Sequence, residues 1–188
     1  MGLPKIEIIF KQLAVTAVKR SQLGIVGLIV KEPSKNWDIK VYKDITDIKD
    51  GDYTANTVAL VKDTFEYTPN KVFVFNVGSG TLTDTLKKVA QERVNWLGLG
   101  YDGKDGDTAT LVSWIKSVRK AGKTYKAVVF NATKPDNKGI VNLMNSKVTF
   151  VDNRGEVEGW QYVPTILGML AGLPMTRSAT SFLCGNLK

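Results

Sequence analysis

The stretch Lys71–Val77 constrains the fold most, because its residues, KVFVFNV, are apolar almost throughout. A strand that shows no alternation of apolar and polar residues is buried on both faces, which is typical of the centre of a parallel sheet covered by helices. Gly24–Val30, Asn95–Tyr101 and Tyr125–Asn131 are further short apolar runs, and we expect them to be buried strands as well. The sequence therefore predicts a parallel sheet with helices on both faces.

Segments with helical periodicity alternate with these strands along the chain. Four helices are expected: Thr57–Phe65 capped by Asn56, Leu82–Val94 capped by Thr81 or Thr83, Thr108–Lys120 ended by Gly122, and Tyr162–Leu170 with Pro164 in its first turn. Trp37–Tyr42 is predicted to be a half-exposed strand. Lys147–Val151 is predicted to be a strand as well, the fourth counted from residue 71 onward. Alternation of strand and helix from residue 71 to 170 predicts an α/β fold: a three-layer, mostly parallel sheet flanked by helices.

The chain begins with a segment that this α/β pattern does not absorb. Ile6, Ile8 and Phe10 alternate with charged residues, a period of two that is typical of a half-buried strand, yet no hairpin signal returns the chain to a partner. The partner is either an edge of this chain's own sheet or a sheet in another chain, and the residues leave both open. Fully extended, Leu3–Lys19 spans about 55 Å at ~3.3 Å per residue. We therefore expect an extended N-terminal arm, residues 1–20, before an α/β domain, residues 21–188.

Composition excludes several classes of function. No apolar run reaches the ~18 residues of a membrane helix. The net charge of +8 comes from lysines that are spread along the chain and mostly interleaved with Asp or Glu, which favours a solvated surface over a nucleic-acid site. The chain has no histidine, so Ser-His-Asp catalysis, Cys-His catalysis and imidazole metal ligands are excluded. The single cysteine, Cys184, allows no internal disulfide and indicates a reducing, cytoplasmic folding environment.

Three local patterns could carry chemistry, and each has a simpler structural interpretation. Gly78–Gly80 lies between a strand and a helix and could hold a phosphate, so a small α/β nucleotide-binding protein or enzyme is the alternative function. The pattern matches neither GxGxxG nor a P-loop. Asp102, Asp105 and Asp107 lack EF-hand spacing, and a turn with a helix-capping aspartate is expected. Cys184 has no neighbouring histidine or second cysteine, so an incidental thiol is expected. We predict no catalytic, cofactor-binding or metal-ligating residues and no enzymatic activity.

Three stretches together carry a resemblance to a known family: residues 1–10 (MGLPKIEIIF), residues 19–29 (KRSQLGIVGLI) and residues 162–180 (YVPTILGMLAGLPMTRSAT). They resemble the tail sheath proteins of contractile phage tails and phage-tail-like bacteriocins, in particular the short sheath type of Gram-positive prophages. The similarity spans essentially the whole chain, and structural stretches rather than a catalytic signature carry it.

The resemblance implies a structural, non-enzymatic virion subunit with no cofactor and no nucleic-acid or membrane partner. In that family, subunits form hexameric rings stacked helically around a tail tube and joined to a baseplate, and the sheath contracts to drive the tube through a cell envelope. Arms add strands to the sheets of neighbouring subunits, which would make Ile6, Ile8 and Phe10 subunit-linking residues. The resemblance places the protein in the bacterial cytoplasm during assembly and in the phage tail or tail-like particle after release.

Family members are longer than this chain. They continue past the counterpart of Thr180 into a tube-facing domain and a C-terminal arm. The chain is therefore expected to be a fragment of a longer protein, and its net charge then describes only part of the subunit.

Overall fold

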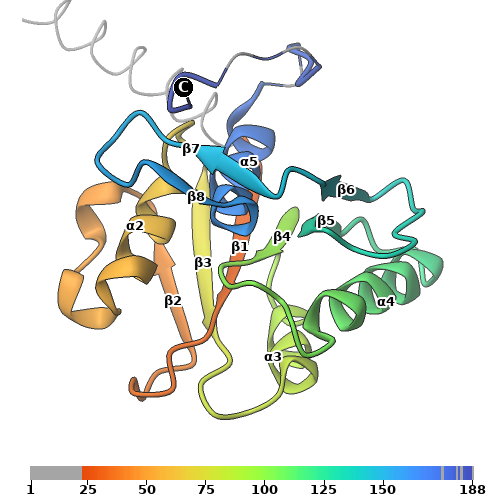
Figure 1. The fold of residues 1–188 in the computed structure, drawn as a ribbon. Helices are drawn as coiled ribbons and strands as arrows, with labels where there is room; N and C mark the ends of the chain where they lie inside the picture. Colours follow the sequence, from red (N-terminus) through yellow and green to blue (C-terminus); the bar gives the residue numbers. More distant parts are fainter. Residues whose placement is uncertain (1–22, 175, 181, 183, 188) are drawn as a thin grey trace, which may run out of the picture.

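The computed structural model describes residues 23–174, 176–180, 182 and 184–187. In this part of the chain, six strands form one sheet in the order β2-β3-β1-β4-β5-β6, and β2 alone runs antiparallel to its neighbour (Figure 1). The strands are β1 (Ile25–Val30), β2 (Ile39–Tyr42), β3 (Lys71–Asn76), β4 (Trp96–Leu99), β5 (Lys126–Phe130) and β6 (Ile140–Leu143). The predicted mostly parallel sheet is confirmed.

Helices cover both faces of this sheet, with α3 and α4 on one face and α2 and α5 on the other (Figure 1). The helices are α2 (Ala55–Asp63), α3 (Leu82–Val89), α4 (Asp107–Lys120) and α5 (Val163–Gly172). Strand β3 shows why both faces need covering. Phe73 and Phe75 lie in the core under α3 and α4, while Val72 and Val74 lie in the core under α2 and α5. The predicted three-layer α/β arrangement is therefore confirmed.

Two predicted helix ends are confirmed by their hydrogen bonds. The hydroxyl of Thr81 accepts a hydrogen bond from the backbone N–H of Asp84 at 3.2 Å and so caps the start of α3. Gly122 follows α4 with a φ of +84°, and its N–H donates to the carbonyl of Arg119 at 3.0 Å. Glycine reaches this left-handed conformation without the steric cost that a side chain would bring.

Two other predicted helix boundaries are wrong. Helix α2 begins at Ala55 with Thr54 as its N-cap, not after Asn56. The hydroxyl of Thr54 does not cap the helix but donates to the buried carboxylate of Glu32 at 2.7 Å. Helix α3 ends at Val89 rather than Val94, because the chain must turn there to enter β4. The apolar pattern in the sequence continues past the end of the helix because Val94, which lies in the turn after α3, is also buried in the core.

The predicted strand at Lys147–Val151 is present over Lys147–Thr149, but its expected place in the main sheet is wrong. The sheet instead ends with β6, which follows β5 without an intervening helix. The side chain of Asn142 stabilises this short connection, because its amide accepts from the N–H of Ala132 at 2.9 Å and donates to the carbonyl of the same residue at 3.1 Å.

Strand β7 (Lys147–Thr149) and strand β8 (Glu156–Glu158) form a separate antiparallel hairpin across the end of the molecule that carries the chain's C-terminus (Figure 1). A 3-10 helix, η3 (Gly159–Tyr162), connects the hairpin to α5. Two further short 3-10 helices, η1 (Ile45–Asp47) and η2 (Asp50–Asp52), lie between β2 and α2 along the chain.

Removing a side chain from the doubly covered sheet should destabilise the protein strongly. Phe75 is fully buried, so Phe75→Ala should lower the free energy of unfolding by about 3–5 kcal/mol through lost burial and a cavity. Val41 of the edge strand β2 is 48% exposed, and Val41→Ala should cost less than about 0.5 kcal/mol. Urea unfolding followed by circular dichroism measures both variants, and equal losses would contradict the assignment of Phe75 to the core.

Candidate functional site

The predicted linking residues Ile6, Ile8 and Phe10 lie outside the described residues. The structure can therefore show only which surfaces could accept a strand from another copy. Three such surfaces exist among the described residues: the outer edges of β6 and β2, and the hairpin β7–β8.

The outer edge of β6 is available for pairing. On its inner side, the N–H of Ala127 donates to the carbonyl of Gly139 and the N–H of Asn131 donates to the carbonyl of Leu143, both at 2.8 Å. Since alternate residues of a parallel strand bond the same neighbour, the backbone of Ile140 and Asn142 faces away from β5. The N–H of Ile140 already donates to the carbonyl of Asn137 at 3.0 Å, so a new strand would pair with the carbonyl of Ile140 and with the backbone of Asn142. No strand in the described ranges pairs with this side. An open strand edge is a template for another strand.

Strand β2 is the other terminal strand of the sheet, and its edge is better protected. It has four residues, as β6 does, and it ends where the acidic segment containing η1 and η2 begins. Lys40 of this strand is held by an ion pair with Asp52 at 2.5 Å and lies 5.5 Å from the ring centroid of Trp37. A charged side chain on the strand is one of the usual protections of an edge. The edge of β6 is therefore the better acceptor.

The hairpin β7–β8 already accepts a strand-like segment from its own chain. Phe150 forms an antiparallel bridge with Leu187, and the N–H of Val151 donates to the carbonyl of Asn186 at 3.0 Å. Phe150 is fully buried, and its ring lies 5.8 Å from that of Tyr162. The hairpin thus shows that short segments can add to this sheet through main-chain hydrogen bonds and an apolar anchor.

Cys184 packs against the same small core. It is half-buried, and its Sγ lies 3.7 Å from the sulfur of Met169. Phe182 packs edge-on against Tyr67 with ring centroids 5.5 Å apart. Burial and the neighbouring Cys184 raise the pKa of Tyr67 to about 12, so this phenol is neutral at physiological pH. These contacts hold the C-terminal segment against α5, through Met169, and against the turn after α2, through Tyr67.

Arg154 fastens the hairpin to the α/β body. Its guanidinium donates to both carboxylate oxygens of Asp63, at 2.6 and 3.0 Å, and stacks on the ring of Phe150 with 3.8 Å to the centroid. Asp63 is the last residue of α2, 91 positions away in the sequence. Burial raises the pKa of the Asp63 carboxyl, and the hydrogen bonds from Arg154 lower it in part. No local sequence signal could have revealed this pair, because it depends on how the hairpin packs.

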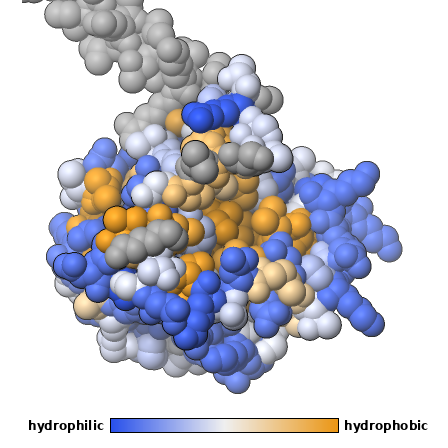
Figure 2. Space-filling model, turned by 45° about the horizontal axis from the view of Figure 1, so that its top comes forward, coloured by the Kyte–Doolittle hydropathy of each residue, from blue (hydrophilic) through white to orange (hydrophobic). Residues whose placement is uncertain are grey.

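Apolar side chains gather on the end of the molecule that carries α5 and the hairpin, as Figure 2 shows in orange. Met144 and Val151, which flank the hairpin strands, are 63% and 54% exposed. Large exposed apolar patches are uncommon on monomeric soluble proteins and usually mark contact surfaces.

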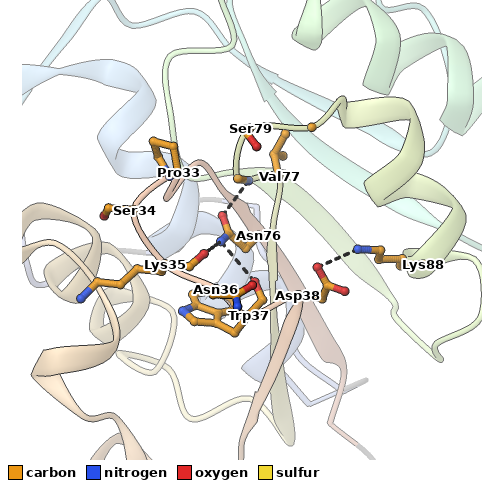
Figure 3. A pocket seen from close by; sticks show the side chains of 12 residues that line it. Pro33, Ser34, Lys35, Asn36, Trp37, Asp38, Asn76, Val77, Ser79 and Lys88 are labelled. Atoms are coloured by element: carbon orange, nitrogen blue, oxygen red, sulfur yellow. Dashed lines mark hydrogen bonds and ion pairs between the residues drawn. The ribbon is translucent and has the colours of Figure 1, made fainter.

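The Gly78–Gly80 loop borders a cavity of about 500 Å³, but the site does not favour phosphate (Figure 3). The side chain of Asn76 ties the loop down by accepting from the N–H of Glu32 and of Gly78, both at 2.9 Å. The adjoining start of α3 is already capped by Thr81 and carries the carboxylate of Asp84 in its first turn. A carboxylate there takes up the favourable field of the helix N-terminus and repels another anion. The geometry therefore does not support the nucleotide-binding alternative.

Two of the three aspartates at the start of α4, Asp102 and Asp107, also have structural partners. Asp102 accepts the N–H of Lys104 at 3.3 Å, and Asp107 accepts the hydroxyl of Tyr101 at 2.9 Å. Gly106 occupies the N-cap position of α4, so the predicted capping by an aspartate side chain is wrong. Within the described residues, no three His, Cys, Asp or Glu side chains come together as a metal site. The helices described here are also too short or too polar to span a membrane.

The fold and its surfaces define a class of protein: a doubly covered α/β domain with an appended hairpin and open edges suited to association between chains. The comparisons name the particular relatives. The chain is 28% identical, over 192 aligned positions, to a tail sheath protein of Clostridium phage phiCD119. This match covers 95% of the chain and 51% of the relative, so the chain spans about half the length of that protein. No family profile matches the chain.

Solved structures show the same fold. The sheath tail protein from Listeria innocua superposes with a TM-score of 0.69 at 16% identity, covering 90% of this chain and 62% of that one. The sheath tail protein from Desulfitobacterium hafniense superposes with a TM-score of 0.63 at 14% identity, covering 80% and 59%. The contracted helical sheath of the anti-feeding prophage gives 0.55 at 13% identity, covering 77% and 45%. The resemblance to contractile tail sheath proteins inferred from the sequence is confirmed.

Breaking the clasp between Arg154 and Asp63 should loosen the hairpin. Arg154→Ala leaves a mostly buried carboxylate without its two hydrogen bonds, and it should lower the free energy of unfolding by about 2 kcal/mol. Lys147→Ala removes a solvent-exposed ion pair with Glu156 on the same hairpin and should cost less than about 0.5 kcal/mol.

Urea unfolding measures the stability of both variants, and amide hydrogen exchange locates the change. In Arg154→Ala, the amides of β7 and β8 should exchange faster while those of β1 and β3 stay protected. Unchanged exchange in the hairpin would show that Arg154 does not hold it.

Proposed function

We propose that this chain forms the body of a contractile tail sheath subunit, which polymerises around a tail tube and contracts to drive the tube through a cell envelope. The observation that carries the proposal is the sequence similarity to a phage tail sheath protein along 95% of the chain. The match of the fold to sheath structures, one of them a contracted helical sheath, supports it further. Because the chain spans about half of that relative, the contacts to the tube and the baseplate are proposed for the whole subunit.

The proposed role is structural rather than enzymatic. Two polar side chains beside the loops that could have carried chemistry contribute to the fold: Asn76 ties down a loop, and Asp107 accepts a hydrogen bond from Tyr101. Assembly in the bacterial cytoplasm, followed by a place in the released tail or tail-like particle, belongs to the same proposal.

We further propose that residues 1–20 act as a linking arm that adds a strand to the sheet of a neighbouring copy, with Ile6, Ile8 and Phe10 as its apolar anchors. Their alternation with charged residues suits a strand with one buried face. The open edge of β6 offers backbone groups for such a strand, and Val141 and Met144 offer exposed apolar surface beside it. Strand addition binds through main-chain hydrogen bonds, while side-chain pockets set the register.

Substitution of the anchors tests the arm. The triple variant Ile6→Asp, Ile8→Asp, Phe10→Asp, made in the polypeptide expressed from the complete gene, should abolish tubes seen by negative-stain electron microscopy, because each Asp would be buried without a partner. Lys5→Asp together with Lys11→Asp places the same residue on the opposite face of the strand and should leave assembly intact. Tubes formed by the triple variant would show that the arm does not link subunits.

A further inference from the structure

The lysines occur along the whole chain and mostly alternate with acidic residues, but one stretch, which lies at one end of the sheet, departs from this pattern. Residues 111–140 contain seven basic residues and one acidic residue, a net charge of +6 compared with +8 for the whole chain. The basic residues are Lys116, Arg119, Lys120, Lys123, Lys126, Lys134 and Lys138. We call this group the basic end. It comprises the second half of α4, the turn after it, the start of β5 and the connection to β6 (Figure 1).

The basic end has no carboxylate partners of its own. None of its seven side chains forms an ion pair with an acidic residue in the described part of the chain. The polar contacts it does make are to main-chain or aromatic groups: Lys116 donates to the carbonyl of Lys134, and Lys126 lies over the ring of Trp96. Lys120, Lys123 and Lys138 are exposed. Concentrated like charge without a partner raises the free energy of the isolated chain and favours contact with an acidic surface.

An excess of acidic residues lies at the other end of the same sheet. Residues 38–66 contain seven acidic and four basic residues, a net charge of −3. Two of these carboxylates pair with cations from outside the segment, Asp38 with Lys88 and Asp63 with Arg154. We call this segment the acidic end. It comprises β2, η1, η2 and α2 (Figure 1). Asp38 and Asp50 have side chains that are 71% and 76% exposed, each in an ion pair with a lysine that is itself more than a third exposed. Such exposed pairs exchange partners at little cost.

The two ends are separated by the full width of the sheet, because β2 and β6 are its terminal strands. They cannot neutralise each other within one molecule, but the basic end of one copy can meet the acidic end of the next. This contact is head-to-tail, so each added copy presents the same two ends again. A repeating head-to-tail contact produces a closed ring or an open helical array.

We propose that the basic end of each copy docks against the acidic end of a neighbouring copy of this chain, and that this contact sets the order of subunits side by side in the assembly. The inference rests on the proposed sheath function and deepens it by naming the two faces that meet. Charge complementarity of this kind guides encounter and register more than it adds affinity, and salt weakens it. A nucleic acid is the other polyanion that the basic end could meet, and the test distinguishes the two.

Charge reversal tests the contact in the polypeptide expressed from the complete gene, purified after nuclease treatment. The basic-end variant carries Lys120→Glu, Lys123→Glu and Lys138→Glu, which change exposed side chains. Self-association in low salt, measured by sedimentation velocity, should weaken by about tenfold or more if each lost pair contributes about 0.5 kcal/mol. Association of the wild type should weaken in the same direction when salt is raised.

A compensating variant makes the test specific. Adding Asp38→Lys and Asp50→Lys to the basic-end variant reverses both faces and should restore at least part of the association. The matched control carries Lys31→Glu, Lys87→Glu and Lys104→Glu, an equal change of net charge at exposed lysines outside both ends, and it should associate like the wild type.

The outcomes separate this inference from the proposed function. Tubes formed equally well by the wild type and the basic-end variant would overturn the inference and leave the sheath function standing. Loss in the control as large as in the basic-end variant, or no recovery in the compensating variant, would also overturn it. DNA binding of the wild type and of the basic-end variant is measured separately, by retention of added DNA. If the basic-end variant retains less DNA than the wild type but self-associates equally well, the basic end is assigned to nucleic acid. A wild type that never self-associates would overturn the inference and the sheath function together.

Discussion

The pairing of β1 with β3 is the contact on which the rest of the structure depends. The two strands run parallel in register from Ile25 opposite Lys71 to Val30 opposite Asn76, and nearly every side chain between these ends is buried. Because both faces of both strands are apolar, helices must cover the sheet on each side. Asn76 finishes the pair, since its amide donates to the carbonyls of Glu32, Lys35 and Trp37 and so fixes the chain that leaves β1.

Helix α5 packs closely against the end of α2, at the end of the molecule that carries the hairpin. A Cβ at Gly168 would lie 2.3 Å from the carbonyl oxygen of Thr64, and one at Gly172 would lie 1.8 Å from that of Tyr67. Glycine at these positions lets α5 approach the end of α2 more closely than any other residue would allow. The hairpin, the C-terminal segment and the clasp at Arg154 are all positioned by that approach, so the apolar end seen in Figure 2 is a consequence of core packing.

The sequence predicts the central strands well because burial on both faces leaves an uninterrupted apolar run, as in β3. It does not predict β6, because Ile140–Leu143 is a short, half-buried edge strand that includes a polar Asn. Contacts between distant residues leave no local signal either: Glu32 meets Thr54 across 22 positions, and Arg154 meets Asp63 across 91. The charge of residues 111–140 and 38–66 can be counted in the sequence, but the acceptor edge and the placement of these segments at opposite ends of the sheet become visible only once the strand order is known. The arm residues Ile6, Ile8 and Phe10 lie outside the described residues, so their role stays a prediction from sequence.

A sheath that contracts needs subunits that move relative to one another without separating, and the two proposed kinds of contact meet these needs differently. Strand addition at β6 depends on main-chain hydrogen bonds, which hold a segment firmly once it has paired. Contacts between charged ends are individually weak, act over about 10 Å at 0.1 M salt and tolerate shifts in position. Movement between subunits is not expected to deform the core of each subunit, because close-packed interiors deform little. In the proposed assembly, relative movement would therefore fall to the charged faces, while the arms keep neighbouring copies connected.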